Sequence, residues 1–196
     1  MNTFYRIARY FVRFALFFVH PVFRITGREN IPEGPAVICC NHSNLTDPIW
    51  VLLGLWLDRM PASMAKKEAL EAPVLGRFLR FMGAIGVDRG AADINAVKLS
   101  LKALRDGNKL LVFPEGTRVR PGKIVEAKTG AALLANRAEV PMLPVFLTRN
   151  KKIFCPMKVA IGKPFYVEKA GNRITQQELQ DATDRLMREI YAMEEA

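Results

Sequence analysis

Short apolar runs alternate with helical patterns along this chain. The clearest helix covers residues 92–106, where apolar and basic residues fall on opposite faces at a spacing of three to four positions. The runs that predict strands cover residues 23–27, 36–40, 109–113, 141–147 and 157–161. Strands that alternate with helices in this way predict a single α/β domain with a largely parallel mixed sheet flanked by helices.

Prolines and capping residues refine this pattern. Prolines within 141–147 predict an irregular or edge position for that strand. Thr175 and Glu178 have the spacing of a capping box, which predicts the start of a terminal helix. Further helices are predicted over 49–57, 70–82 and 129–138.

The N-terminal stretch from Phe4 to Phe23 is almost wholly apolar, but Arg6, Arg9 and Arg13 interrupt it. On a helix these arginines fall within an arc of about 60°. The longest uncharged run, Phe14 to Val19, is far shorter than the roughly 20 residues that a spanning helix needs. The stretch is also a poor secretory signal, because its apolar core is short. We expect an amphipathic helix in the membrane interface over residues 1–22, with arginines at the headgroups and phenylalanines below. A helix packed on the protein's own core is the alternative.

The composition indicates a folded, basic protein. Among 196 residues, 29 Lys and Arg against 19 Asp and Glu give a net charge of +10, which favours an acidic partner such as an anionic membrane, a phosphorylated substrate, an acidic protein or a nucleic acid. The cysteines, Cys39, Cys40 and Cys155, form no even framework and have no metal-ligand spacing. A reducing, cytosolic compartment fits them best.

One histidine lies where chemistry is expected. His42 follows the buried strand 36–40, and Asp47 with Pro48 has the pattern of a helix entry, with Asp47 at the N-cap. On a straight helix the side chains of His42 and Asp47 would point about 140° apart, so they can meet only if the loop folds back. If they meet, the carboxylate can hold one imidazole nitrogen and leave the other as a general base. A hydrogen-bonded loop histidine beside a capping aspartate is the structural alternative.

Other polar segments also follow predicted strands. Asp88 and Arg89 come after the short run at residues 83–87. Residues 115–118, Glu-Gly-Thr-Arg, come after the strand predicted over 109–113. Sites in parallel sheets form at the carboxyl ends of the strands, so Arg89 and Arg118 are candidate phosphate ligands. Lysines at 66, 67 and 128 could add charge, and each basic residue taken alone could be a solvated surface charge.

The chain lacks the sequence motifs of several enzyme classes. It has no G-x-S-x-G elbow, P-loop, dinucleotide-binding glycine motif or metal-ligand cluster. The simplest remaining chemistry has His42 deprotonate a substrate hydroxyl, which then attacks an activated carbonyl directly. A backbone N–H or a cationic side chain would stabilise the resulting oxyanion.

Four segments in order resemble a known family. They are Asn41-His42-x4-Asp47 with Pro48, residues 83–89 (Gly-x-x-Gly-Val-Asp-Arg), residues 113–118 (Phe-Pro-Glu-Gly-Thr-Arg) and residues 140–145 (Val-Pro-Met-Leu-Pro-Val). They resemble the motifs of the glycerophospholipid acyltransferases, and bacterial lysophosphatidic acid acyltransferases in particular. The resemblance covers about residues 23–165 and implies an acyltransferase domain over 23–196.

The resemblance implies roles for particular residues. His42 would be the general base on the sn-2 hydroxyl of lysophosphatidic acid, and Asp47 would orient it. Arg89 and Arg118 would hold the acceptor's phosphate with help from Lys66. Glu115, Gly116 and Thr117 would shape the acceptor site. Residues 140–145 would lie near the acyl chain or form an ordinary core strand.

The resemblance also implies partners and a location. The donor would be a thioester of acyl carrier protein or coenzyme A, with no metal or organic cofactor and no nucleic acid partner. The protein would lie on an anionic membrane, on the cytoplasmic face, as a peripheral or monotopic enzyme. Three alternatives remain open: another lysophospholipid or an amine as acceptor, a thioesterase, and a non-enzymatic basic protein that binds membranes or nucleic acids.

Overall fold

The computed structural model describes residues 3–73, 75–81, 83–88, 93–120, 123 and 125–195. The strands are β1 (Phe23–Thr26), β2 (Val37–Cys40), β3 (Ala62–Lys66), β4 (Ala84–Val87), β5 (Leu110–Val112), β6 (Met142–Leu147) and β7 (Met157–Ile161). The helices are α1 (Thr3–Phe17), η1 (Arg28–Asn30), α2 (Asp47–Leu55), α3 (Lys67–Glu71), α4 (Leu75–Phe81), α5 (Ile94–Arg105), α6 (Gly130–Ala138) and α7 (Gln176–Glu195).

The strands form one mixed sheet in the order β1-β7-β6-β2-β5-β3-β4. Pairing is parallel from β6 through β2, β5 and β3 to β4. β7 pairs with β6 in the antiparallel sense and with β1 in the parallel sense. β1 and β7 therefore run opposite to the other strands, and the predicted α/β domain with a largely parallel mixed sheet is confirmed.

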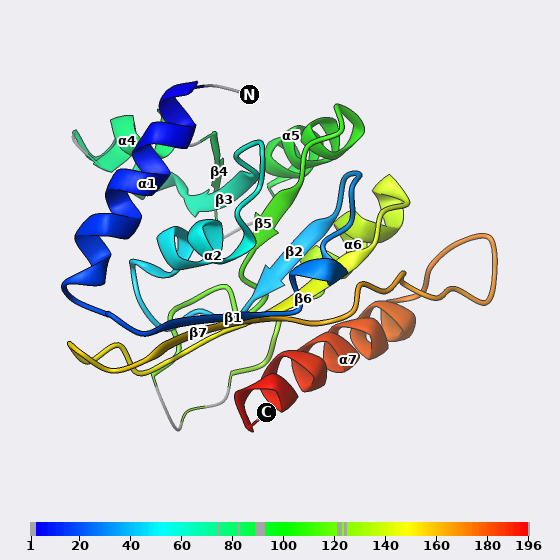
Figure 1. Ribbon diagram of the computed structural model, residues 1–196. Coiled ribbons are helices and arrows are strands. Elements are labelled where there is room, and N and C mark those ends of the chain that lie inside the picture. The colour runs from blue at the N-terminus through cyan, green and yellow to red at the C-terminus, as the bar shows by residue number, and fades with distance from the viewer. Residues whose placement is uncertain are drawn as a thin grey trace.

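Helices cover both faces of the sheet (Figure 1). Side chains alternate along β2, so Val37 and Cys39 face a core that α5, α6 and α7 complete. Ile38 and Cys40 face a second core, where α2 packs on the sheet. This alternation explains why the strand at 36–40 is apolar at every position: both of its faces are buried.

Two local predictions were wrong for reasons that involve proline. The helix expected over 70–82 is divided into α3 and α4, because Ala72, before Pro73, adopts an extended conformation at ψ 133°. The strand β6 lies inside the sheet although it contains Pro144, which was expected to mark an irregular or edge position. The pairing of β6 with β7 begins at Val145, so Pro144 lies just outside that ladder.

Helix α1 forms at the N-terminus but turns Arg9 and Arg13 toward the domain. Arg9 is buried, its guanidinium lies 4.1 Å from the ring centroid of Trp56, and its Nη1 donates to the Leu57 carbonyl at 3.0 Å. Arg13 lies over the ring of Phe23. The expectation that Arg9 and Arg13 lie among lipid headgroups was therefore wrong, because aromatic rings and a carbonyl of the domain bind them. The side chain of Arg6 lies outside the described part of the structure.

The opposite face of α1 carries large apolar side chains that remain exposed. They are Ile7, Tyr10, Phe11, Phe14 and Phe17. Among the described residues, no helix combines the length and the hydropathy that crossing a bilayer requires.

Candidate active site

The polar segments singled out in the sequence converge at one edge of the sheet. Strands β2 to β6 run in the same direction, so their carboxyl ends lie at this edge. β1 and β7 run the other way, so they begin where the others end. The loop after β6 and the turn that enters β1 therefore join the histidine loop there.

The loop after β2 folds back so that His42 and Asp47 meet. His42 Nδ1 lies 2.9 Å from Asp47 Oδ2, and the same oxygen accepts the backbone N–H groups of Ser43 at 2.6 Å and Asn44 at 2.7 Å. Helix α2 begins at Asp47 with Thr46 at its N-cap. The predicted N-cap position of Asp47 is therefore wrong: its carboxylate binds the loop before the helix.

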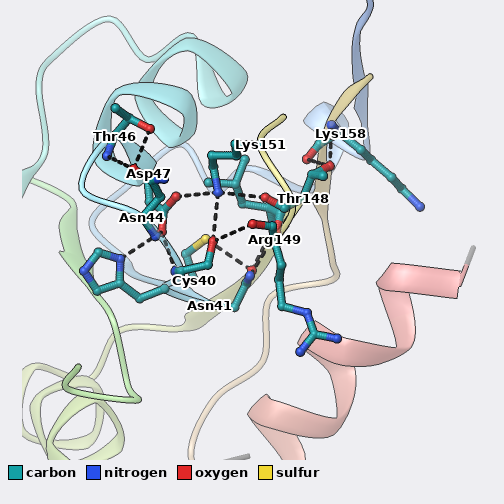
Figure 2. Close-up of polar contacts among 12 residues, drawn as sticks. Cys40, Asn41, Asn44, Thr46, Asp47, Thr148, Arg149, Lys151 and Lys158 are labelled. Carbon is teal, nitrogen blue, oxygen red and sulfur yellow. Dashed lines mark hydrogen bonds and ion pairs between the residues drawn. The ribbon is translucent and has the colours of Figure 1, made fainter. Parts of the chain in front are cut away.

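A lysine occupies the other oxygen of this carboxylate. Lys151 Nζ lies 2.6 Å from Asp47 Oδ1 and donates to Ser43 Oγ at 2.9 Å and to the Thr148 carbonyl at 2.7 Å. The Lys151 side chain is 6% exposed and that of Asp47 is fully buried. Figure 2 shows Lys151 pointing from the loop after β6 toward Asp47. A cation thus compensates a buried anion directly beside the histidine.

These contacts set the charge of Asp47 and the tautomer of His42. Burial alone would raise the pKa of the Asp47 carboxyl, but hydrogen bonds from His42 and Lys151 outweigh burial and bring the pKa below its usual value. An ionised carboxylate can only accept hydrogen bonds, so the proton of the neutral imidazole lies on Nδ1. The Nε2 atom then carries the lone pair that a general base needs. Phe113 stacks on the imidazole, with centroids 4.2 Å apart, and limits its rotation.

The segment after β5 binds the backbone of the histidine loop. The buried Glu115 accepts the His42 N–H with Oε2 at 2.7 Å and the Tyr191 hydroxyl with Oε1. Val119 N–H donates to the His42 carbonyl at 2.7 Å. Burial raises the pKa of Glu115, and the hydrogen bonds from Tyr191 and His42 partly oppose this. Since Tyr191 belongs to α7, the terminal helix helps to fix the position of His42.

The remaining residues of the 115–118 segment lie nearer the surface. Gly116 adopts a φ of +64°, and a Cβ there would come within 3.1 Å of Lys128 Cε, so both the conformation and the space favour glycine. Thr117 and Arg118 are exposed. An exposed guanidinium at this edge is available to an anionic ligand.

Two predicted phosphate ligands are not placed against the histidine. Lys66 ends β3 with its side chain about half exposed, and it forms an ion pair with Glu68 at 2.9 Å. Arg89 lies outside the described residues. Among the described residues, the segment after β5 and the loop after β6 are the neighbours that contact the histidine loop through the bonds given above.

A cavity of about 360 Å³ adjoins this edge. Phe113, which stacks on His42, lines it together with Pro114 and Gly116. Its other lining residues are Met64, Ala65, Val87, Asp88, Val97, Val112, Lys128, Thr129, Gly130, Ala131, Leu133 and Leu134. Residues 140–145 are absent from this lining and are buried, so the alternative of an ordinary core strand describes them.

Lys151 and Tyr191 were not predicted from the sequence. Lys151 follows β6, so the rule that singled out the ends of β2, β4 and β5 would also have singled out the polar residues after β6. Tyr191 gave no such signal, because it lies 76 positions from Glu115 on a long helix. Only the packing of α7 against the sheet brings the two together.

Comparison with known proteins assigns the family. The Acyltransferase family model matches residues 22–148. This range includes the His42–Asp47 pair and the segment after β5. The chain belongs to the Acyltransferase family. The match starts at the turn before β1 and ends just after β6, so Lys151 and Tyr191 lie beyond it.

Curated members of the family from bacteria are similar over most of this acyltransferase. The 1-acyl-sn-glycerol-3-phosphate acyltransferase of Bacillus subtilis is 29% identical over 177 residues, which cover 87% of each chain. The protein of that name from Pseudomonas aeruginosa is 28% identical over 178 residues, covering 82% of this chain and 67% of that protein. The crystal structure of the 1-acyl-sn-glycerophosphate (LPA) acyltransferase PlsC from Thermotoga maritima matches the fold with a TM-score of 0.66 at 24% identity, covering 88% of this chain and 72% of that one.

Proposed function

We propose that this acyltransferase is a 1-acyl-sn-glycerol-3-phosphate acyltransferase, which transfers an acyl chain from a thioester to the sn-2 hydroxyl of lysophosphatidic acid and forms phosphatidic acid. The names of the bacterial relatives support the substrate and the product. The observation that carries the proposal is the contact of His42 with a buried, ionised Asp47, which leaves Nε2 as a base. We further propose that the reaction uses no metal or organic cofactor.

The proposed reaction needs one proton acceptor and one activated carbonyl. His42 Nε2 takes the proton of the sn-2 hydroxyl as its oxygen attacks the thioester carbon. The tetrahedral intermediate then expels the thiolate, which takes the proton back from the imidazolium. Asp47 stabilises the imidazolium without changing its own protonation state, as expected of a carboxylate with a lowered pKa. Ser43 is no nucleophile in this scheme, because its Oγ contacts Lys151 and the Arg149 carbonyl.

The surroundings of His42 suggest where the substrate groups lie. The exposed Arg118 would bind the phosphate end of the acceptor, together with Arg89 and Lys66, and residues 115–117 would shape the acceptor site. The cavity beside Phe113 is lined mainly by apolar side chains and would accept a hydrocarbon chain. The net charge of +10 suits an acidic acyl carrier protein as donor and an anionic lipid surface as location, with the protein peripheral or monotopic on the cytoplasmic face.

Acyl transfer with three variants tests this proposal. Wild type, His42→Ala and Ser43→Ala would receive lysophosphatidic acid and labelled acyl thioesters of acyl carrier protein and of coenzyme A, in detergent micelles. We expect His42→Ala to lose about 10²- to 10⁴-fold in rate, the usual contribution of a general base. Ser43→Ala is the matched control from the same loop, and we expect it to retain activity within about tenfold, since it loses one hydrogen bond of the lysine.

Other outcomes would contradict parts of the proposal. Thioester loss that is equally fast without lysophosphatidic acid would indicate a thioesterase. Inactive Ser43→Ala with active His42→Ala would overturn the direct transfer. Transfer to other lysophospholipids but not to lysophosphatidic acid would keep the family chemistry and change the acceptor. A folded wild type with no transfer from either donor would overturn the proposed function.

A further inference from the structure

We propose that the tip of the loop between β6 and β7, Ile153 and Phe154, is a second membrane-inserting element that acts together with α1 and holds the histidine loop at the bilayer surface. This inference rests on the membrane location in the proposed function and names the surface that provides it. Its occupant is the anionic lipid bilayer.

The loop tip is strongly apolar and unusually exposed. Ile153 is 66% exposed and Phe154 is 70% exposed, the latter close to the 72% of Phe11 on the outer face of α1. Phe154 also adopts a positive φ of 63°, an uncommon conformation for an aromatic residue. Within the described structure the domain does not cover these side chains, although burying either one would be favourable in any apolar medium.

Hydrogen bonds join this tip to the end of α1. The Phe154 N–H donates to the Val19 carbonyl at 2.8 Å, just past the last turn of α1. His20, which is buried, places its Nδ1 2.9 Å from the Cys155 carbonyl. Met157 N–H donates to the Val22 carbonyl at 2.9 Å as β7 starts beside β1. Figure 1 shows the β6–β7 loop beside the end of α1, in agreement with these bonds.

The charge around both elements is complementary to anionic lipid. Residues 1–28 and residues 140–167 contain no Asp or Glu, and among their basic side chains Arg9 and Lys151 are bound within the domain. Lys152, next to the tip, and Arg24, at the start of β1, are exposed. A surface that combines exposed phenylalanines with positive charge alone matches a bilayer with acidic headgroups better than it matches an ordinary protein partner.

The loop that carries the tip also carries a residue of the site. Lys151, two positions before Ile153, binds Asp47 Oδ1 and Ser43 Oγ (Figure 2). Leu45, in the histidine loop itself, is 62% exposed. A bilayer that accepts Phe154 would therefore lie next to the loop that holds His42, where a lysolipid could reach the base without leaving the membrane.

Vesicle binding tests the inference independently of catalysis. The probe is co-sedimentation with vesicles of about 30% anionic lipid, comparing wild type with the double variant Ile153→Ser/Phe154→Ser. Burying a phenylalanine or isoleucine gains roughly tenfold or more in partitioning, so we expect the double variant to bind about 10²-fold more weakly. Tyr166→Ser is the matched control: Tyr166 is 62% exposed but lies beside Glu168, Glu178 and Asp181, and we expect unchanged binding.

Activity in detergent separates this inference from the proposed function. We expect the double variant to keep wild-type transfer rates and melting temperature in detergent micelles, because both side chains are exposed. Vesicle binding equal to that of wild type would overturn the inference, whether or not the enzyme transfers acyl chains. A lipid-free wild-type dimer that the double variant converts to a monomer would also overturn it, because the tip would then bind a second copy of the chain.

Discussion

At the scale of single residues, the buried ion pair between Asp47 and Lys151 controls the histidine. A buried carboxylate is costly unless it is paired and hydrogen-bonded. Asp47 has both kinds of partner: Lys151 binds one oxygen, while His42 and two backbone N–H groups bind the other. The orientation of His42 therefore depends on Lys151, although the two residues bind different oxygens of Asp47.

We predict that Lys151→Met destabilises the protein at neutral pH by about 3 kcal/mol, because it leaves a buried charge without its cation. The loss should be smaller in acid. Asp47 has a lowered pKa in the folded state, so its stabilising contribution is present above the unfolded value of about 3.9 and is lost as pH falls through the folded value. Urea unfolding at pH 7 and at about pH 3.5 measures the difference.

The double variant Lys151→Met/Asp47→Asn provides the control for this prediction. Asparagine removes the buried charge, so part of the lost stability should return. Lys151→Met alone should also raise the pKa of Asp47, because it removes the hydrogen bond and the charge of the lysine. Equal stability of Lys151→Met and wild type at pH 7 would mean that the ion pair does not offset the burial of Asp47.

At the scale of elements, the closeness of α2 to the sheet decides where Asp47 lies. Gly54, near the end of α2, has no side chain, and a Cβ there would lie 2.6 to 2.9 Å from three atoms of the Val159 side chain on β7. Arg28 Nε also donates to the Gly54 carbonyl at 3.0 Å. Since α2 begins at Asp47, a shift of this helix would move the carboxylate away from His42.

We predict that Gly54→Ala lowers the free energy of unfolding by about 1–3 kcal/mol, although alanine is intrinsically the better helix former by about 1 kcal/mol. Thermal unfolding of Gly54→Ala, Val159→Ala and the double variant would measure the coupling between the two positions. Because Val159→Ala removes two of the three close atoms, Cγ1 and Cγ2, the double variant should lose less stability than the sum of the two single losses. A Gly54→Ala variant more stable than wild type would contradict the close packing.

The elements also show how far local pattern reasoning extends. The helix predicted over 92–106 is α5, with Asp93 as N-cap accepting from Ala96 N–H at 2.9 Å. The capping box is confirmed by reciprocal bonds between Thr175 and Glu178. Both depend on neighbours within a few positions. The break at Pro73 is equally local, since proline restricts the residue before it, but it was missed. The interior place of Pro144 was missed because it depends on which neighbours the sheet supplies.

At the scale of the whole molecule, charge and exposed apolar surface act together. The net charge of +10 adds long-range attraction to an anionic bilayer, while the phenylalanines of α1 contribute only on contact. Salt screens the electrostatic attraction, since the Debye length falls from about 10 Å at 0.1 M to about 3 Å at 1 M. It leaves the apolar contact of the phenylalanines largely intact.

We predict that binding to anionic vesicles weakens by at least tenfold between about 0.1 and 1 M salt. Binding to neutral vesicles should be weaker at low salt and should change little over the same range. Co-sedimentation at several salt concentrations measures both series. Binding with the same salt dependence on both kinds of vesicle would contradict an electrostatic contribution from the net charge.

By itself the sequence determined the α/β class, the position of most elements and the strand ends that carry His42, Asp47 and Glu115. Such features follow from the period of apolar side chains and from turn residues, which act over a few positions. It also marked His42 and Asp47 as a pair that a folded-back loop could join, and the loop does fold back.

Only the tertiary structure decided what surrounds that pair. The reversed direction of β1 and β7 brings the loop after β6 beside the end of α1, and Lys151 then reaches Asp47 across 104 positions of sequence. The packing of α7 places Tyr191 on Glu115. Burial also decided that Arg9 of α1 turns inward and the phenylalanines outward. An amphipathic pattern shows that two faces differ, but which face meets the domain depends on the rings and carbonyls that the folded domain presents.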